Sequence, residues 1–328
     1  GLGDDTNTSD ILALTVNDAS LDAAGTTALV ALLEKTGGKI KVDATVVAVT
    51  GTIEDLTSIY VTNKAKFEGL GNEIVNIPAA DVVSAAQLNA IAAATSGIVK
   101  ATLSSDTPLN AATVTALKDV KTTDDITFDS EIDTLDSVEA LNALLAIKKI
   151  IPTATFASVT TIEADAKDIA LVKDVLKLSA NAAVTINGEI SAADANIIAK
   201  SGTGAGALTA TIKAGTVKAT LDALGDSLSA VDIITFKTTD TSVDAFDLVT
   251  LAAKVDDFDA SSVKTITSAN EVNVVAALAI VEDANVTITG NVTVAGIEAI
   301  LDATEGKVTA TLEAGSASDL AIKLADDE

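Results

Sequence analysis

The sequence predicts an α/β fold: a right-handed solenoid of about eleven helix–strand repeats of ~27 residues with stacked parallel β-strands. Three observations predict it. Segments of the chain repeat one another, each segment joins a helix-like half to a strand-like half, and the strand-like halves recur at a regular spacing. Strands that are joined through a helix are normally parallel, with right-handed crossovers.

The clearest internal repeat pairs residues 84–103 with residues 293–312, which are identical at 10 of 20 positions without a gap. Residues 29–44 and 191–212 are looser copies. Extending the pattern along the chain places strands near residues 40, 66, 99, 126, 154, 184, 208, 233, 257, 286 and 308. A spacing of about 27 residues is too short for separate domains and suits one coil of a solenoid.

The first half of each repeat has the spacing of an amphipathic helix, with apolar residues at i, i+3 and i+4. These residues are Leu88, Ile91 and Ala92 in one copy and Ile297, Ile300 and Leu301 in the other. Pairs of the capping-box type are expected to begin several helices: Thr52 with Asp55, Ser84 with Gln87, Ser191 with Asp194, and Thr241 with Asp244.

Glycine is expected to end the helical half, because it adopts the left-handed conformation of a helix C-cap at little steric cost. Gly38, Gly97 and Gly306 occupy this place. The glycine-rich stretch 201–206 follows a helix and precedes a strand, which is the wrong order for a phosphate-binding loop, so it is interpreted as a C-cap loop.

The second half of each repeat alternates apolar and polar residues with period two, as in Val99, Ala101 and Leu103. Five of the six phenylalanines fall in this half, and in a stacked solenoid they would form part of a continuous core column: Phe67, Phe128, Phe156, Phe236 and Phe258. Several are followed by a second short extended piece.

The predicted organisation has three parts: an acidic N-terminal segment (1–17), a continuous α/β solenoid (18–316), and the helix of a further partial repeat or a junction (317–328). The chain contains no methionine, so we expect that Gly1 is not the native start. We expect the sequence to be a segment of a longer secreted protein.

The phrase from Phe258 to Ile266 resembles the strand part of leucine-rich repeats, although the asparagine of that signature is absent. Short α/β units rich in Thr, Ala, Asp and Val also resemble the repeats of large bacterial cell-surface proteins, such as S-layer proteins, adhesins and the giant repeat proteins of marine cyanobacteria. This resemblance implies an extracellular location and a structural or adhesive role. It implies no catalytic residue.

Composition excludes several kinds of chemistry. The chain has no His and no Cys, and all 21 of its basic residues are Lys, so neither a Ser-His-Asp nor a Cys-His mechanism can operate and no thiolate site can form. The formal net charge of −26 repels nucleic acid and favours cations. No apolar run approaches the ~20 residues of a membrane span. The sequence therefore predicts no enzyme, no nucleic-acid partner and no membrane span.

Calcium is the one cofactor that the sequence leaves possible, since hard cations prefer oxygen ligands from Asp, Glu and backbone carbonyls. Asp4, Asp5 and Asp10 form the candidate calcium site, although the segment lacks the glycine and terminal glutamate of an EF-hand. Other acidic clusters, at 124–125, 256–259 and 326–328, are interpreted as solvated surface charge.

The preferred hypothesis is a non-enzymatic structural protein of an extracellular assembly: a surface layer, sheath, filament or adhesin stalk. Its expected partners are other copies or neighbouring repeats of the same chain, together with divalent cations. The alternatives are a solenoid binding module for polysaccharide or protein, and a segment of a phage fibre.

Overall fold

The computed structural model describes residues 8–201 and 206–315, and these fold as an α/β structure with several parallel sheets. The chain divides into two compact units. Unit 1 comprises residues 1–161 with 177–179, and unit 2 comprises residues 162–176 with 180–328.

Unit 1 alternates short helices with short strands. Two of its helical turns, η1 and η3, are 3-10 helices, and η2 is a π-helix. In chain order the elements are β1 (Leu14–Val16), α1 (Ala23–Ala31), η1 (Leu32–Glu34), β2 (Ile40–Val42), β3 (Ala48–Thr50), α2 (Ile53–Thr57), η2 (Ser58–Thr62), η3 (Lys64–Lys66), β4 (Phe67–Glu68), β5 (Ile74–Asn76), β6 (Val82–Val83), α3 (Ala85–Ala94), β7 (Val99–Leu103), α4 (Ala111–Ala116), β8 (Asp125–Thr127), β9 (Thr134–Leu135) and α5 (Val138–Ile150).

Unit 2 has longer strands and the same alternation. Its elements are β10 (Thr161–Asp165), η4 (Ala166–Asp168), α6 (Ile169–Leu176), β11 (Ala183–Ile190), α7 (Ala192–Ser201), β12 (Leu208–Gly215), α8 (Val217–Leu224), β13 (Ile233–Thr238), β14 (Ser242–Asp244), α9 (Ala245–Ala252), β15 (Asp257–Asp259), β16 (Thr265–Ser268), α10 (Val274–Leu278), β17 (Asn285–Val292), α11 (Val294–Leu301) and β18 (Val308–Leu312).

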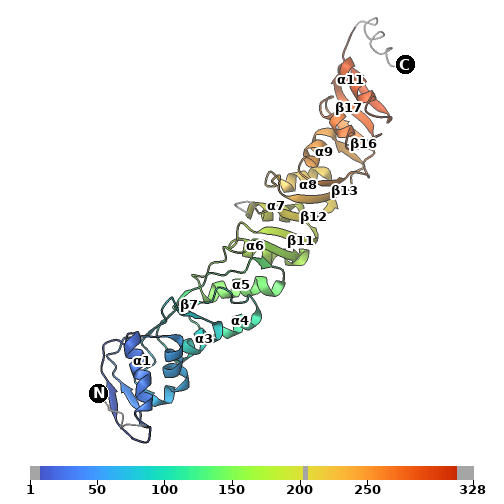
Figure 1. Ribbon diagram of the computed structural model, residues 1–328. Coiled ribbons are helices and arrows are strands. Elements are labelled where there is room, and N and C mark those ends of the chain that lie inside the picture. Colours follow the sequence, from blue (N-terminus) through green and yellow to red (C-terminus); the bar gives the residue numbers. More distant parts are fainter. Residues whose placement is uncertain (1–7, 202–205, 316–328) are drawn as a thin grey trace. The chain divides into compact units, whose positions relative to one another are not determined.

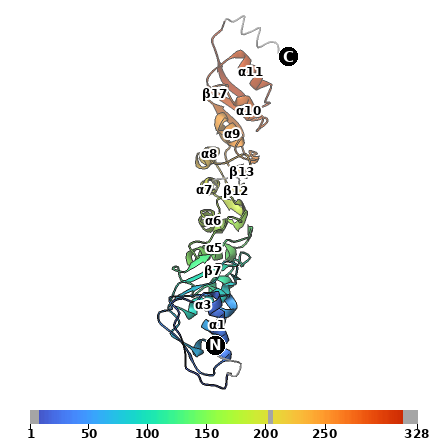
Figure 2. The same cartoon turned by 60° about the vertical axis from the view of Figure 1, so that its left-hand side comes forward.

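Strands of successive repeats lie next to one another. Unit 1 contains the sheet β1-β2-β4 and the sheet β3-β5-β7-β6, in which β8 also pairs with β7. Unit 2 contains the run β10-β11-β12-β13-β15 and the sheet β14-β16-β17-β18. The pairings β1–β2, β7–β8, β12–β13 and β17–β18 are all parallel. Within unit 2, helices α7 to α11 follow one another in the same order as the strands that they connect (Figures 1 and 2).

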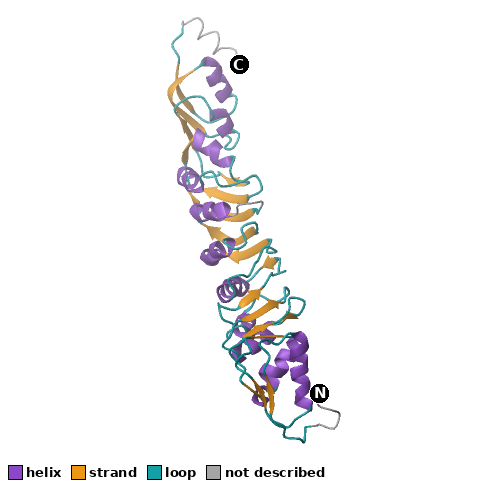
Figure 3. Ribbon diagram, turned by 90° about the vertical axis from the view of Figure 1, so that its left-hand side faces the viewer, coloured by secondary structure: helices purple, strands orange, loops and turns teal. Residues whose placement is uncertain are grey.

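The core lies between the helices and the strands of each unit, which appear as separate purple and orange layers around the middle of unit 2 (Figure 3). Leu88, Ile91 and Ala92 on α3 are buried, as the helical spacing predicted. In the matching helix α11 the prediction is wrong for one residue: Ile297 and Ile300 are buried, but Leu301 is 48% exposed.

The predicted helix starts are confirmed at Thr52, at Ser191, and at Ser84, where both halves of the capping box form. The prediction is wrong for Thr241. The side chain of Asp244 caps α9 by accepting the backbone N–H groups of Phe246 and Asp247, because the short strand β14 extends the chain by three residues before the helix begins.

The predicted role of the helix-ending glycines is also wrong. Gly38, Gly97 and Gly306 are not among the described glycines with positive φ. Instead, the turns that contain these glycines pass very close to the backbone that leads into the neighbouring strand. A Cβ atom on Gly97 would lie 2.0 Å from the carbonyl oxygen of Glu73, and one on Gly306 would lie 2.3 Å from that of Ala284. Glycine is needed here because the two backbone segments leave no room for a side chain.

Most strands begin where the sequence placed them, but the one expected near residue 154 does not form. That region has an isolated bridge between Asp129 and Thr155, and β10 follows it. Pro152 lies at this place, and proline cannot donate a hydrogen bond to a strand ladder. The second extended pieces do form strands, among them β5 and β16.

The phenylalanines form pairs in the core of each unit. Phe128 and Phe156 meet edge to face in unit 1, with ring centroids 6.0 Å apart. Phe236 and Phe258 stack in unit 2, with centroids 5.8 Å apart, and face each other across β13 and β15. Phe67 lies opposite Ile40, so the column that the sequence predicted is mixed aromatic and aliphatic.

None of the helices in residues 8–201 and 206–315 is long and apolar enough to cross a membrane.

The close approach of neighbouring turns can be tested with the glycines at the two ends of β12. A Cβ atom at position 206 would lie 2.3 Å from the carbonyl oxygen of Ala182, whereas at position 215 its nearest neighbour is 3.6 Å away. We expect Gly206→Ala to lower the free energy of unfolding by about 2 kcal/mol, since the backbone must shift, and Gly215→Ala to change it by less than about 1 kcal/mol. Urea unfolding followed by circular dichroism measures both. Equal effects would contradict the proposed packing constraint.

Candidate functional site

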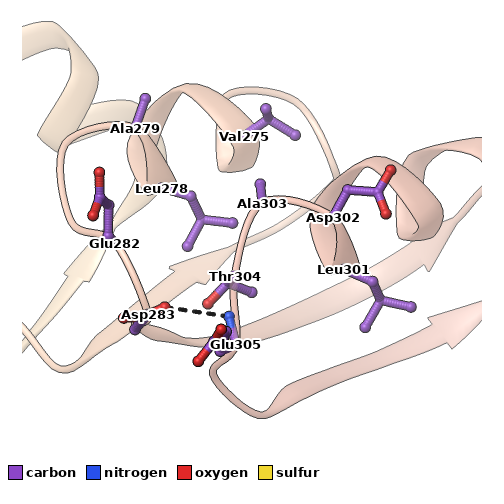
Figure 4. A pocket seen from close by; sticks show the side chains of 10 residues that line it. All are labelled: Val275, Leu278, Ala279, Glu282, Asp283, Leu301, Asp302, Ala303, Thr304 and Glu305. Carbon is purple, nitrogen blue, oxygen red and sulfur yellow. Dashed lines mark hydrogen bonds between the residues drawn. The ribbon is translucent and has the colours of Figure 1, made fainter.

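A surface groove in unit 2 is the candidate site that the structure brings together. It lies between α10 and α11 and the loops that follow them, with a volume of about 410 Å³ (Figure 4). Its apolar part includes Val275, Leu278 and the exposed Leu301. In Figure 4 the side chain of Leu278 points from α10 into the space beside Ala303.

Four carboxylates line the groove, and no basic residue does: Glu282, Asp283, Asp302 and Glu305. Asp283 adopts a left-handed backbone conformation, with φ of 61°, and its carboxylate accepts the backbone N–H of Glu305 at 3.4 Å. This hydrogen bond joins the loop after α10 to the loop after α11 (Figure 4). The groove is therefore both apolar and anionic, and its chemistry suits a ligand that carries a cation beside an apolar part.

The carboxylates of the groove do not converge as a metal centre would require. Among the described residues, no three Asp, Glu, His or Cys side chains lie close enough together to hold a metal ion. Of the predicted calcium ligands, Asp4 and Asp5 lie outside the described residues. Asp10 is described, and its backbone carbonyl accepts hydrogen bonds from the hydroxyl of Thr36 at 3.0 Å and the N–H of Gly37 at 2.7 Å.

Two of the acidic clusters seen in the sequence have structural partners. The buried carboxylate of Asp124 accepts the N–H of Val99, the first residue of the neighbouring strand, at 2.9 Å, and the N–H of Lys121 at 2.8 Å. Asp256 accepts the N–H of Ile234 in the same way, at 2.9 Å. The interpretation as solvated surface charge is therefore wrong for Asp124, whose carboxylate is buried. Asp256 is exposed and also accepts a strand-end N–H, which needs an acceptor.

Cation–anion pairs cross between neighbouring strands on the outer face of the sheets. Lys100 lies 3.2 Å from Asp125, and Lys237 lies 2.6 Å from Asp259. The hydrogen bond from Lys237, with further ones from Ser261, holds the pKa of Asp259 well below its usual range. The third acidic cluster, residues 326–328, lies outside the described part of the chain.

A buried polar pair in unit 1 was not predicted. Tyr60 lies on the π-helical turn η2 and is 2% exposed, and its hydroxyl donates to the carboxylate of Glu73, which is 3% exposed. That carboxylate also accepts the N–H groups of Gly71 at 2.8 Å and Asn72 at 3.0 Å. Burial, the hydrogen bond to Glu73 and its negative charge together raise the pKa of Tyr60.

No sequence signal marked this pair, because the two residues are thirteen positions apart and belong to no spacing motif. The groove was missed for a similar reason. Leu301 matched the apolar face of a helix, and helical spacing alone does not show where a neighbouring helix is too short to cover it.

No protein-family model matches this chain, and no curated protein matches it either.

The Tyr60–Glu73 pair gives a prediction about pH. The pKa of Tyr60 is higher in the folded protein than in the unfolded chain, where it is near 10. The contribution of Tyr60 to stability is therefore fully present below pH 10 and is lost as the pH rises above that value. Tyr60 is the only tyrosine, so ultraviolet absorbance should show no tyrosinate until the protein unfolds at alkaline pH. Tyr60→Phe should lower the free energy of unfolding at neutral pH by about 1–3 kcal/mol, since Glu73 loses a buried partner. Reversible titration of folded protein near pH 10 would contradict this.

Proposed function

We propose that this chain is a non-enzymatic structural repeat protein, an α/β solenoid that forms part of an extracellular assembly at the cell surface. The observation that carries the proposal is the repeated pairing of equivalent strands. Leu14 faces Ile40, Ile212 faces Phe236, and Val286 faces Val308, each across a parallel pair whose members belong to successive helix–strand units. Repeats of this kind bury a continuous core only by stacking, which suits a scaffold.

The solenoid interpretation rests on the strand connections. β11, β12 and β13 are neighbours in one sheet, and a helix separates each of them from the next along the chain. A right-handed crossover at each helix would generate a regular coil of about 27 residues. About eleven such coils would account for the alternation of helix and strand across both units.

A structural role also agrees with how the polar side chains are used. The clustered aspartates Asp124 and Asp256 bind strand ends, and Lys100 and Lys237 pair with aspartates on the next strand. A chain without His or Cys has few means of nucleophilic or general-base catalysis. We therefore propose no enzymatic activity.

Divalent cations, calcium in particular, are the proposed co-assembling ions. The net charge of −26 opposes any contact between copies, and cation binding would offset it. The predicted ligands Asp4, Asp5 and Asp10 remain the candidates within the chain.

The second candidate function is a binding module for polysaccharide or protein, and the groove between α10 and α11 is the observation that favours it. Its four carboxylates and exposed Leu301 suit a lysine-bearing peptide. We expect saturable binding of such a peptide in titration calorimetry, reduced at least about fivefold by Leu301→Ser, since an exposed apolar contact of this size contributes about 1–2 kcal/mol. Val47→Ser, on an exposed residue of unit 1, is the control. Equal binding by both variants would contradict a role for the groove.

The assembly proposal predicts calcium-dependent self-association. Purified protein at rising concentration should form larger species in millimolar calcium, seen by sedimentation velocity and as sheets or filaments by electron microscopy, because cations offset the repulsion between acidic copies. A chelator should reverse the association, and sodium chloride of equal ionic strength serves as the control for screening alone. A monodisperse monomer at high concentration in calcium would contradict the proposal, as would glycosidase activity of the purified chain.

A further inference from the structure

Strand β18 has a less covered inner face than its closest counterpart in the chain. The inward residues of β7, Val99, Ala101 and Leu103, are 0%, 6% and 1% exposed. The equivalent residues of β18, Val308, Ala310 and Leu312, are only half-buried. The two strands belong to the clearest sequence repeat, and their inward residues are identical at all three of these positions, so composition does not explain the difference.

A neighbouring strand explains it. β7 has β8 on its further edge, where Ala101 faces the buried Ile126. Among the described residues, β18 pairs with β17 alone. Strand β1 in unit 1 shows the same pattern: its inward residues Leu14 and Val16 are half-buried, whereas Ile40 and Val42 opposite them are fully buried.

Both strands also lack two of the features that protect a sheet edge, which are charged side chains and proline. Natural edge strands carry charges, especially Lys, or Pro, which discourage pairing with another chain. Residues 11–16 and 308–312 contain neither, and Ile11 beside β1 is 86% exposed.

We propose that β1 of a second copy of this chain adds in parallel to β18, so that copies join head to tail. A second copy suits the site because it would continue an established sheet with the pairing geometry that already joins β17 to β18 and β1 to β2. Two different surfaces meet in such a contact, so it is heterologous and can repeat from copy to copy. The inference rests on the proposed assembly function and names its contact.

The repeat also sets the register of the contact. Ile40 follows Gly38 by two residues, as Val308 follows Gly306, and Leu14 faces Ile40. Leu14 is therefore expected opposite Val308, which places Thr15 opposite Thr309 on the exposed face. Residues that lie opposite each other on the exposed face of neighbouring strands already form salt bridges within the chain. These are Lys100 with Asp125 and Lys237 with Asp259.

A charge exchange at this pair tests the contact. Thr15→Lys with Thr309→Lys should weaken association, since like charges face each other, and Thr15→Lys with Thr309→Asp should restore it, with an association constant at least about fivefold higher. The control variant is Thr127→Lys with Thr309→Lys, which has the same net charge as Thr15→Lys with Thr309→Lys. Its two lysines do not face each other in the proposed contact, because Thr127 lies on the outer face of β8. The control should therefore associate more strongly than Thr15→Lys with Thr309→Lys. Thermal unfolding by circular dichroism checks that all three fold.

Disulfide trapping gives an independent measurement, because the chain has no native cysteine. Adjacent strands lie about 4.8 Å apart, within the Cα separation that a disulfide bridges. Mild oxidation of the Thr15→Cys/Thr309→Cys variant should produce a ladder of cross-linked oligomers, and the Thr127→Cys/Thr309→Cys variant should not.

The results of these experiments distinguish failure of the proposed β1–β18 contact from failure of the proposed assembly function. Assembly of the unaltered protein, with equal association of the charge variants and no ladder, would overturn the β1–β18 contact and leave the proposed function standing. Efficient dimerisation of Thr309→Cys alone would show that β18 pairs with itself. Hydrogen-exchange protection, in the monomer, of those amides of residues 308–312 that do not pair with β17 would show that the same chain covers the far edge of β18. Either result overturns the inference. Failure of every variant and of the unaltered protein to associate would overturn both proposals.

Discussion

Backbone pairing between parallel strands is the constraint on which the rest of this structure depends. Adjacent strands lie about 4.8 Å apart, so the turns that lead into neighbouring strands come close to one another. At Gly97 and Gly306 that distance leaves no room for a Cβ atom against the carbonyl oxygens of Glu73 and Ala284. Glycine at these two turns follows from the strand spacing.

The same constraint decides how charge is used. A strand end brings a backbone N–H close to the next turn, and Asp124 and Asp256 supply the acceptor there. On the outer face, side chains opposite each other on adjacent strands come close enough for Lys100 to meet Asp125 and for Lys237 to meet Asp259. Part of the acidic excess thus serves the connections between neighbouring strands.

Two features depart from the repeat, and each arises where a helix is irregular. In unit 1 the helix after α2 widens into the π-helical turn that carries Tyr60, and its hydroxyl meets the buried carboxylate of Glu73. In unit 2, α10 ends after five residues while α11 continues to Leu301, which leaves the acidic groove between them. The first departure buries a polar pair and the second leaves a groove that is partly acidic and partly apolar, and both are compatible with a binding or structural role.

Much of the fold could be predicted from the sequence because its signals are local. Helical spacing identified the buried face at Leu88, Ile91 and Ala92, and alternation identified strands such as β7 and β12. Local patterns failed where contacts between segments far apart in the sequence decided the outcome. The glycines after the helices were predicted to be left-handed caps, whereas the close approach of a neighbouring backbone segment requires them. Leu301 was predicted to be buried in the core, but it is 48% exposed.

The sequence by itself therefore determined the class of structure and the absence of His and Cys chemistry, since both depend on composition and on periodicity along one segment. Only the tertiary structure decided which acidic residues bind strand ends, which side chains line the groove and which strands pair on one edge alone among the described residues. Those properties depend on residues more than twenty positions apart, such as Val99 and Asp124, and on the distance between neighbouring strands.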